Sequence, residues 1–319
     1  MCKFFNTFPA IAALMLTVAA AGQGRQERNS KAVTTAMRNI HYHFTNSIVI
    51  EIHRADGRLL PQTGHDIPVF DDPKSFILAI DSAEMSISTD AMTHLMNEYT
   101  FARGDAPLKK IVVSVAAGKL KVKGVLHNKG DLPFETEGFL AATPDGLIRV
   151  HAEKIRAAHL PAKGIMDLFG VEIADLVKTN KVPGVRVEND DLMLDPQQLF
   201  PPPAIQGHVS GVVIRGNDIV LTFGKPGGSS KPPVAGIQNY MAYRGGTLRF
   251  GKLTMADTDL VLVDADQHDS FDFSLSEYSK QLVAGYSKTT SKSGLVVYMP
   301  DYRKLGNRPN GGVVSGAGR

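Results

Sequence analysis

Short apolar or alternating segments, separated by turn-forming residues, recur along this chain and predict a fold dominated by antiparallel β-hairpins. The clearest alternation lies at 119–123, where lysines face one side of the expected strand while Leu120 and Val122 face the other. Asp56–Gly57 predicts a hairpin turn between strands at 48–52 and 59–60. The other expected strands and hairpins are 76–87, 111–123, 134–155, 185–194, 208–223, 247–253, 260–263 and 295–299.

Two segments carry the apolar spacing of amphipathic helices. Residues 91–101 follow the capping residues 88–90, and residues 164–178 repeat apolar side chains with the same period. The pattern predicts an α+β fold: a curved antiparallel sheet packed on these two helices, followed by a small C-terminal α/β unit with a helix at 275–286. The same pattern fits a dry core and a hydrophobic groove between sheet and helices, so both arrangements stay open.

The first 21 residues have the order of a cleaved secretory signal peptide, which predicts a periplasmic or secreted protein. Lys3 precedes an apolar run at 10–18, and Ala19–Ala21 offers small residues for cleavage. An uncleaved N-terminal anchor is the alternative interpretation. Beyond this segment we expect one α+β domain at 22–224, a linker at 225–236, the small C-terminal unit at 237–305 and a disordered tail at 306–319.

Composition narrows the possible functions. The only cysteine, Cys2, would leave with the signal peptide, so the exported chain would have no disulfide, thiolate nucleophile or cysteine metal site. A formal net charge of +3 does not predict nucleic-acid binding. The chain has no G-x-S-x-G elbow, H-E-x-x-H helix, phosphate-binding Gly-Lys loop or S-x-x-K motif. We therefore expect a protein that is not an enzyme, with no cofactor and no metal.

Two groups of residues could still suggest a metal. Asp264, Asp266 and Asp269 could offer oxygen ligands to Ca²⁺, but the segment lacks the glycine and the distal glutamate of an EF-hand. We interpret these aspartates as the solvated end of a strand and its turn. His41 and His43 could begin a zinc site, but nothing nearby in the sequence completes it.

The order of elements from about residue 76 to residue 224 resembles the LmeA-like phospholipid-binding family, which is related to the tubular lipid-binding superfamily. The stretches that carry this resemblance are SAEMSISTDAMTHLMNEY, GKLKVKGVL, DGLIRVHAEKI, LPAKGIMDLFGVEIADLV, VPGVRVENDDLMLDP and VSGVVIRGNDIVLTFG. The resemblance implies that 22–224 is a lipid-binding-like domain. In such a domain an elongated, curved sheet is wrapped on helices and the fold contains a hydrophobic cavity. It implies lipid binding or transfer in the cell envelope, and it brings no catalytic residues.

The resulting hypothesis is an exported, non-enzymatic binder or carrier of lipids or other hydrophobic molecules in the cell envelope, with transient contact to a membrane surface. Apolar burial alone, at about 25 cal/mol per Å², could hold an acyl chain. The expected lining residues are Leu95, Met96, Leu120, Val122, Ile148, Val150, Ile165, Leu168, Phe169, Ile173 and Leu176. The alternative is a structural or protein-interaction module of the envelope with a dry core.

Overall fold

The computed structural model describes residues 32–127, 131–157, 160–161, 182–188, 191–225 and 232–307. The predicted signal peptide, the helix predicted at 164–178 and the tail from residue 308 onward lie outside the described residues. Within those ranges, no helix has both the length and the apolar character needed to cross a membrane.

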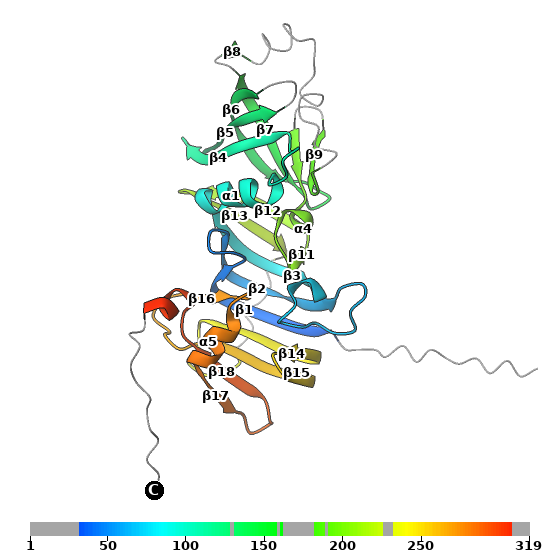
Figure 1. The fold of residues 1–319 in the computed structure, drawn as a ribbon, viewed down its shortest axis with the longest axis vertical. Helices are drawn as coiled ribbons and strands as arrows, with labels where there is room; N and C mark the ends of the chain where they lie inside the picture. Colours follow the sequence, from blue (N-terminus) through cyan, green and yellow to red (C-terminus); the bar gives the residue numbers. More distant parts are fainter. Residues whose placement is uncertain are drawn as a thin grey trace, which may run out of the picture. The chain divides into compact units, whose positions relative to one another are not determined.

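The described residues form two β-sheets, so the prediction of one curved antiparallel sheet is wrong (Figure 1). The larger sheet is mixed and has 11 strands in the order β12-β13-β3-β2-β1-β14-β15-β18-β17, with β11 paired to β3 and β16 paired to β1. The smaller sheet is antiparallel and has seven strands in the order β4-β5-β6-β7-β10-β9, with β8 paired to β7. The fold is therefore mostly β.

The strands of the larger sheet are β1 (Val33–His43), β2 (Val49–Pro61), β3 (Phe76–Ser88), β11 (Ala204–Gln206), β12 (Val209–Arg215), β13 (Asp218–Gly224), β14 (Tyr240–Phe250), β15 (Leu253–Asp264), β16 (Phe271–Ser274), β17 (Tyr286–Thr289) and β18 (Leu295–Met299). Those of the smaller sheet are β4 (Leu108–Ala116), β5 (Lys119–His127), β6 (Asp131–Ala142), β7 (Ile148–Ala157), β8 (Leu160–Pro161), β9 (Val185–Glu188) and β10 (Asp191–Leu194). The short helices are η1 (Pro73–Ser75), α1 (Thr89–Leu95), η2 (Met96–Thr100), α4 (Pro196–Leu199), α5 (Tyr278–Ala284) and η4 (Tyr302–Asn307).

The first predicted amphipathic helix is present as α1 and its π-helical continuation η2. The side chain of Ser88 caps α1 by accepting a hydrogen bond from the Ala91 N–H, as the sequence predicts. Asn97 and Thr93 then hydrogen bond the backbone of β4 at Ile111 and Val113. These bonds occupy backbone groups of an edge strand that would otherwise be open to another chain.

The hairpin predicted around Asp56–Gly57 is wrong, because β2 runs through both residues as one strand. The register of β2 against β3 shifts between Asp56 and Gly57, so the glycine lies at an irregularity in the sheet. A Cβ on Gly57 would lie 2.2 Å from the carbonyl oxygen of Ala79. Glycine at position 57 therefore lets the backbones of β2 and β3 approach closely. This is a different role from the turn that the sequence predicts for it.

The strands that follow the predicted linker continue the larger sheet, because β14 pairs with β1. Within β1 the neighbour on this side changes from antiparallel β14, up to Arg38, to parallel β16, from Ile40 onward. Asn39, between them, has a left-handed φ of 52°, a conformation that asparagine adopts more readily than most residues. This change of neighbour brings the C-terminal end of β1 against β16.

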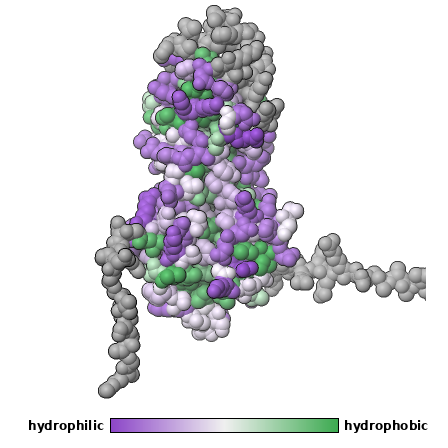
Figure 2. All heavy atoms as spheres, viewed as in Figure 1, coloured by the Kyte–Doolittle hydropathy of each residue, from purple (hydrophilic) through white to green (hydrophobic). Residues whose placement is uncertain are grey.

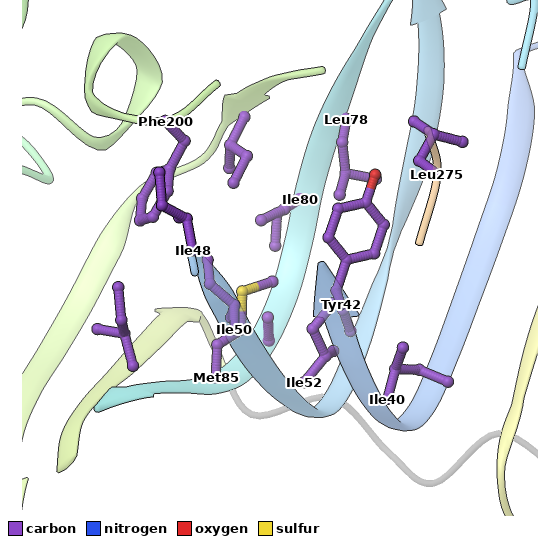
Figure 3. Packing of buried hydrophobic residues seen from close by; sticks show 14 of the residues in the cluster. Ile40, Tyr42, Ile48, Ile50, Ile52, Leu78, Ile80, Met85, Phe200 and Leu275 are labelled. Atoms are coloured by element: carbon purple, nitrogen blue, oxygen red, sulfur yellow. The ribbon is translucent and has the colours of Figure 1, made fainter. Parts of the chain in front are cut away.

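One apolar core runs across both sheets. Figure 3 shows its part on the larger sheet, where Ile50 and Ile52 of β2, and Ile48 just before β2, face the same side as Ile40 and Tyr42 of β1. On the face seen in Figure 2, hydrophilic residues predominate and hydrophobic residues form separate small groups. The buried apolar side chains of the larger sheet belong to this core, where a candidate site lies.

Candidate functional site

An apolar pocket lies on the inner face of the larger sheet. Strands β1, β2, β3, β14 and β16 contribute to it, and Phe70, Pro203 and Leu275 come from segments between strands. Its volume is about 20 Å³, which is room for about one water molecule. The lining residues are Met37, Tyr42, Leu59, Phe70, Phe76, Leu78, Pro203, Tyr243, Phe273 and Leu275.

Tyr42 brings a polar group to this apolar lining. Its ring contacts the rings of Phe44 and Phe273, with centroids 4.9 and 6.0 Å away. In Figure 3 its hydroxyl points away from the sheet, between Leu78 and Leu275. Among the described residues none hydrogen bonds to this hydroxyl. Burial raises the pKa of Tyr42 well above its ordinary value, so the phenol stays protonated and can donate a hydrogen bond.

The structure describes six of the eleven lining residues predicted from the sequence, and these six lie away from the apolar pocket. Leu95, Met96, Leu120 and Ile148 are buried in the apolar core, with 0 to 7% of their surface exposed. Val122 and Val150 are partly buried and pack against that core. None of these six lines the apolar pocket. The other five predicted lining residues, Ile165, Leu168, Phe169, Ile173 and Leu176, lie outside the described residues.

Sequence reasoning missed the pocket because it missed β1. Burial alternates along residues 33–37, with Val33, Thr35 and Met37 buried on one face. The sequence does not alternate apolar and polar side chains here, because Thr35 is polar, so the β-branched residues at 33–35 are the signal that could have identified the strand. The alternation breaks at Asn39, where the strand changes its neighbour, and the apolar pattern changes phase there.

Next to Tyr42 in sequence, His43 belongs to a buried polar network. Its Nε2 hydrogen bonds Oδ1 of Asp272, and both side chains are less than 10% exposed. The other carboxylate oxygen of Asp272 accepts the backbone N–H of Arg303 at 2.9 Å, and the backbone N–H of Asp272 donates to Asp301 at 2.9 Å. Nδ1 of His43 is buried and has no hydrogen-bond partner among the described residues.

A polar pocket of about 560 Å³ opens beside this network. Lys280 and Arg303 give it positive charge, and Glu277 pairs with Lys280 at 2.5 Å. Its mixed charges do not select a ligand of one sign. The full lining is His43, Asn46, Glu277, Lys280, Tyr302, Arg303 and Leu305.

The structure brings together only two of the three aspartates that the sequence suggests as calcium ligands. Asp264 and Asp269 lie close to Asp301, a residue that the sequence analysis did not include. Asp266 hydrogen bonds His268 and Lys304, and these contacts lower its pKa to about 2. The segment is therefore more than the solvated end of a strand, since Asp264 and Asp301 are buried.

The alternating lysines of β5 pair with acidic residues of β6, its neighbour in the sheet, and of β7, the next strand but one. Lys121 pairs with Glu135 at 2.5 Å, Lys123 pairs with the same carboxylate at 3.4 Å, and Lys119 pairs with Glu153 at 2.5 Å. These ion pairs between strands indicate that the lysine-bearing side of β5 is a solvated outer face of the smaller sheet.

No family model, no curated protein and no solved structure matches this chain. The resemblance of residues 76–224 to the LmeA-like family accordingly stays a prediction.

Proposed function

We propose that this protein is an exported, non-enzymatic binder or carrier of lipids or other hydrophobic molecules, and that its ligand occupies the apolar pocket on the larger sheet. The observation that carries the proposal is the pairing of an apolar lining with the hydroxyl of Tyr42, whereas the Tyr243 hydroxyl, also in the lining, contacts the sulfur of Met241 at 3.6 Å. A ligand with an apolar body and one hydrogen-bonding group matches this arrangement. A lipid chain with a hydroxyl or carboxyl group belongs to this class.

Binding would require the pocket to widen, because about 20 Å³ does not hold an acyl chain. Most of the lining residues stand on hydrogen-bonded strands, which resist displacement. Leu275 follows β16 and Pro203 precedes β11, so these two side chains border the pocket from outside the strands. Their movement is the simplest way to make space for a chain. Each methylene then buried contributes about 0.8 kcal/mol.

The small volume of the pocket favours a second candidate, a structural or protein-interaction module whose core is dry. In that case the unpartnered hydroxyl of Tyr42 is tolerated by the fold and serves no ligand. The two candidates differ in whether the purified protein contains or takes up a hydrophobic molecule.

The test combines mass spectrometry with a binding titration. Organic extracts of the purified protein are analysed for co-purified lipid, and a fluorescent fatty acid is titrated into the wild type, Tyr42→Phe and Tyr240→Phe. Tyr240 is the matched control, because it is a buried tyrosine in a separate apolar cluster. We expect saturable binding that Tyr42→Phe weakens about two- to ten-fold, the effect of one hydrogen bond, with Tyr240→Phe unchanged.

Removing the Tyr42 hydroxyl should not lower stability, because that group has no partner to lose. Extracts without lipid, together with no saturable uptake of the fluorescent fatty acid, would exclude the carrier and leave the dry-core module.

A further inference from the structure

Three carboxylates from two segments of the chain converge at the end of β15 and just beyond the end of β18. One oxygen each of Asp264, Asp269 and Asp301 lies within 4.8 Å of the other two. Asp264 is the last residue of β15 and pairs in register with Met299 of β18. The N–H of Ala265 also donates to the Met299 carbonyl at 2.8 Å. This parallel pairing carries Asp301, two residues after β18, to the side of Asp264.

Asp264 is the least satisfied member of this carboxylate cluster. Only 1% of its surface is exposed. Its Oδ1 accepts the backbone N–H of Asp266 at 2.9 Å, while its Oδ2 is buried without a hydrogen-bond partner among the described residues. A buried carboxylate oxygen without a donor is costly unless a proton or a cation compensates it.

The charges around the cluster leave room for a cation. Lys304 reaches Asp301 at 2.7 Å, Asp266 at 3.1 Å and Asp269 at 3.4 Å. In the part of the chain that the structure describes, no hydrogen bond or ion pair joins the Lys304 ammonium group to Asp264, and the Lys304 side chain is 52% exposed. One ammonium group therefore pairs with three of the four carboxylates, and Asp264 is left without it.

We propose that Asp264, Asp269 and Asp301 bind a divalent cation, and that the ammonium group of Lys304 competes with this cation for the same carboxylates. Calcium fits the set best. It accepts irregular arrangements of oxygen ligands at about 2.3–2.6 Å, so ligand oxygens on opposite sides of one ion lie about 5 Å apart. Magnesium demands shorter, near-octahedral contacts. The inference is independent of the hydrophobic-ligand proposal, because no residue of the cluster lines the apolar pocket.

This site could not be assembled from the local sequence. The predicted group of Asp264, Asp266 and Asp269 lacks a distal ligand, and the structure supplies one in Asp301. The sequence-based expectation that no metal binds considered only residues that are close together in the sequence. The proposed calcium site differs from that expectation because it includes Asp301.

The test is a calcium titration of the purified protein, after EDTA treatment and dialysis, by calorimetry and by thermal melting. Magnesium chloride and sodium chloride at matched ionic strength serve as comparison salts. The variants are Asp264→Asn, Lys304→Gln and the control Asp145→Asn, which neutralises an aspartate on a turn of the smaller sheet. We expect calcium, titrated to about 10 mM, to raise the melting temperature of the wild type more than magnesium does.

The variants separate a cation site from a general salt effect. Asp264→Asn should weaken calcium binding about ten-fold or more, Lys304→Gln should strengthen it, and Asp145→Asn should leave it unchanged. Asp264→Asn should also raise the melting temperature in EDTA, because it removes the uncompensated buried charge. No calcium response in the wild type, or an equal response in Asp264→Asn and Asp145→Asn, would overturn the proposal. Weaker calcium binding in Lys304→Gln would overturn the competition.

Discussion

His43 and Asp272, which are 229 residues apart in the sequence, form a buried hydrogen bond because β1 and β16 lie side by side. His41 pairs in register with Asp272, and His43 with Ser274. Burial alone would raise the pKa of Asp272, but the hydrogen bonds from His43 and the Arg303 N–H hold it below its ordinary value. The contact links the N-terminal strand to the C-terminal part of the chain.

Replacing His43 by alanine should strongly destabilise the protein. The change would leave the buried carboxylate of Asp272 short of a donor, at a cost of about 2–5 kcal/mol. His41→Ala is the matched control, because the His41 side chain is 39% exposed and its contact with Glu51 is long, with 4.0 Å between Nε2 of His41 and Oε1 of Glu51. Urea unfolding of both variants measures the difference. Equal stabilities would show that the pair does not hold β1 against β16.

Leu95→Ala tests whether the predicted lining residues belong to a packed core. Leu95 is fully buried, so truncation should cost about 2–5 kcal/mol. Uptake of a fluorescent fatty acid by the folded variant should be unchanged, because Leu95 does not line the apolar pocket. Val283→Ala, at a position 86% exposed, should change stability by less than about 0.5 kcal/mol. A stable Leu95→Ala protein with altered uptake would instead return Leu95 to a ligand-lined groove.

Gly57→Ala should disrupt the irregularity between β2 and β3. The new Cβ would meet the Ala79 carbonyl oxygen at 2.2 Å, so the backbone must shift. We expect a loss of about 1–3 kcal/mol, typical of overpacking. Gly104→Ala serves as the control, because nothing lies within 4 Å of a Cβ at that position. Thermal melts compare the two, and a harmless Gly57→Ala change would mean that this register tolerates a side chain.

Asp264 should make stability fall as pH rises from about 4 to about 7 when EDTA is present. Burial, reinforced by the charges of Asp301, Asp269 and Asp266, raises the pKa of Asp264 from 3.8 to about 7. The folded state then holds this proton more tightly than the unfolded state. Its contribution is fully present below pH 3.8 and is lost as pH rises through 7. Asp264→Asn should gain stability relative to the wild type across this range in urea unfolding at successive pH values. A constant difference would contradict the raised pKa.

Much of the local structure follows from the sequence by itself. The strand at 295–299 matches β18, and the alternating lysines at 119–123 lie on β5 with Lys119 at its start. The Ser88 cap and the apolar spacing after it correctly indicate α1. Such features depend on backbone preferences and on side-chain periods within about ten residues. They therefore need no knowledge of which strands become neighbours.

Only the tertiary structure decided how those elements combine. The turn-like Asp56–Gly57 pair became part of a strand because Gly57 meets the backbone of Ala79 on β3. The apolar pocket, the His43–Asp272 pair and the placement of Asp301 beside Asp264 all depend on pairings between segments far apart in the chain. Residue periods state which face of a strand is apolar, but not which strand will lie beside it. That choice is made by the packing of the whole core and by single residues such as Asn39, where β1 changes its neighbour.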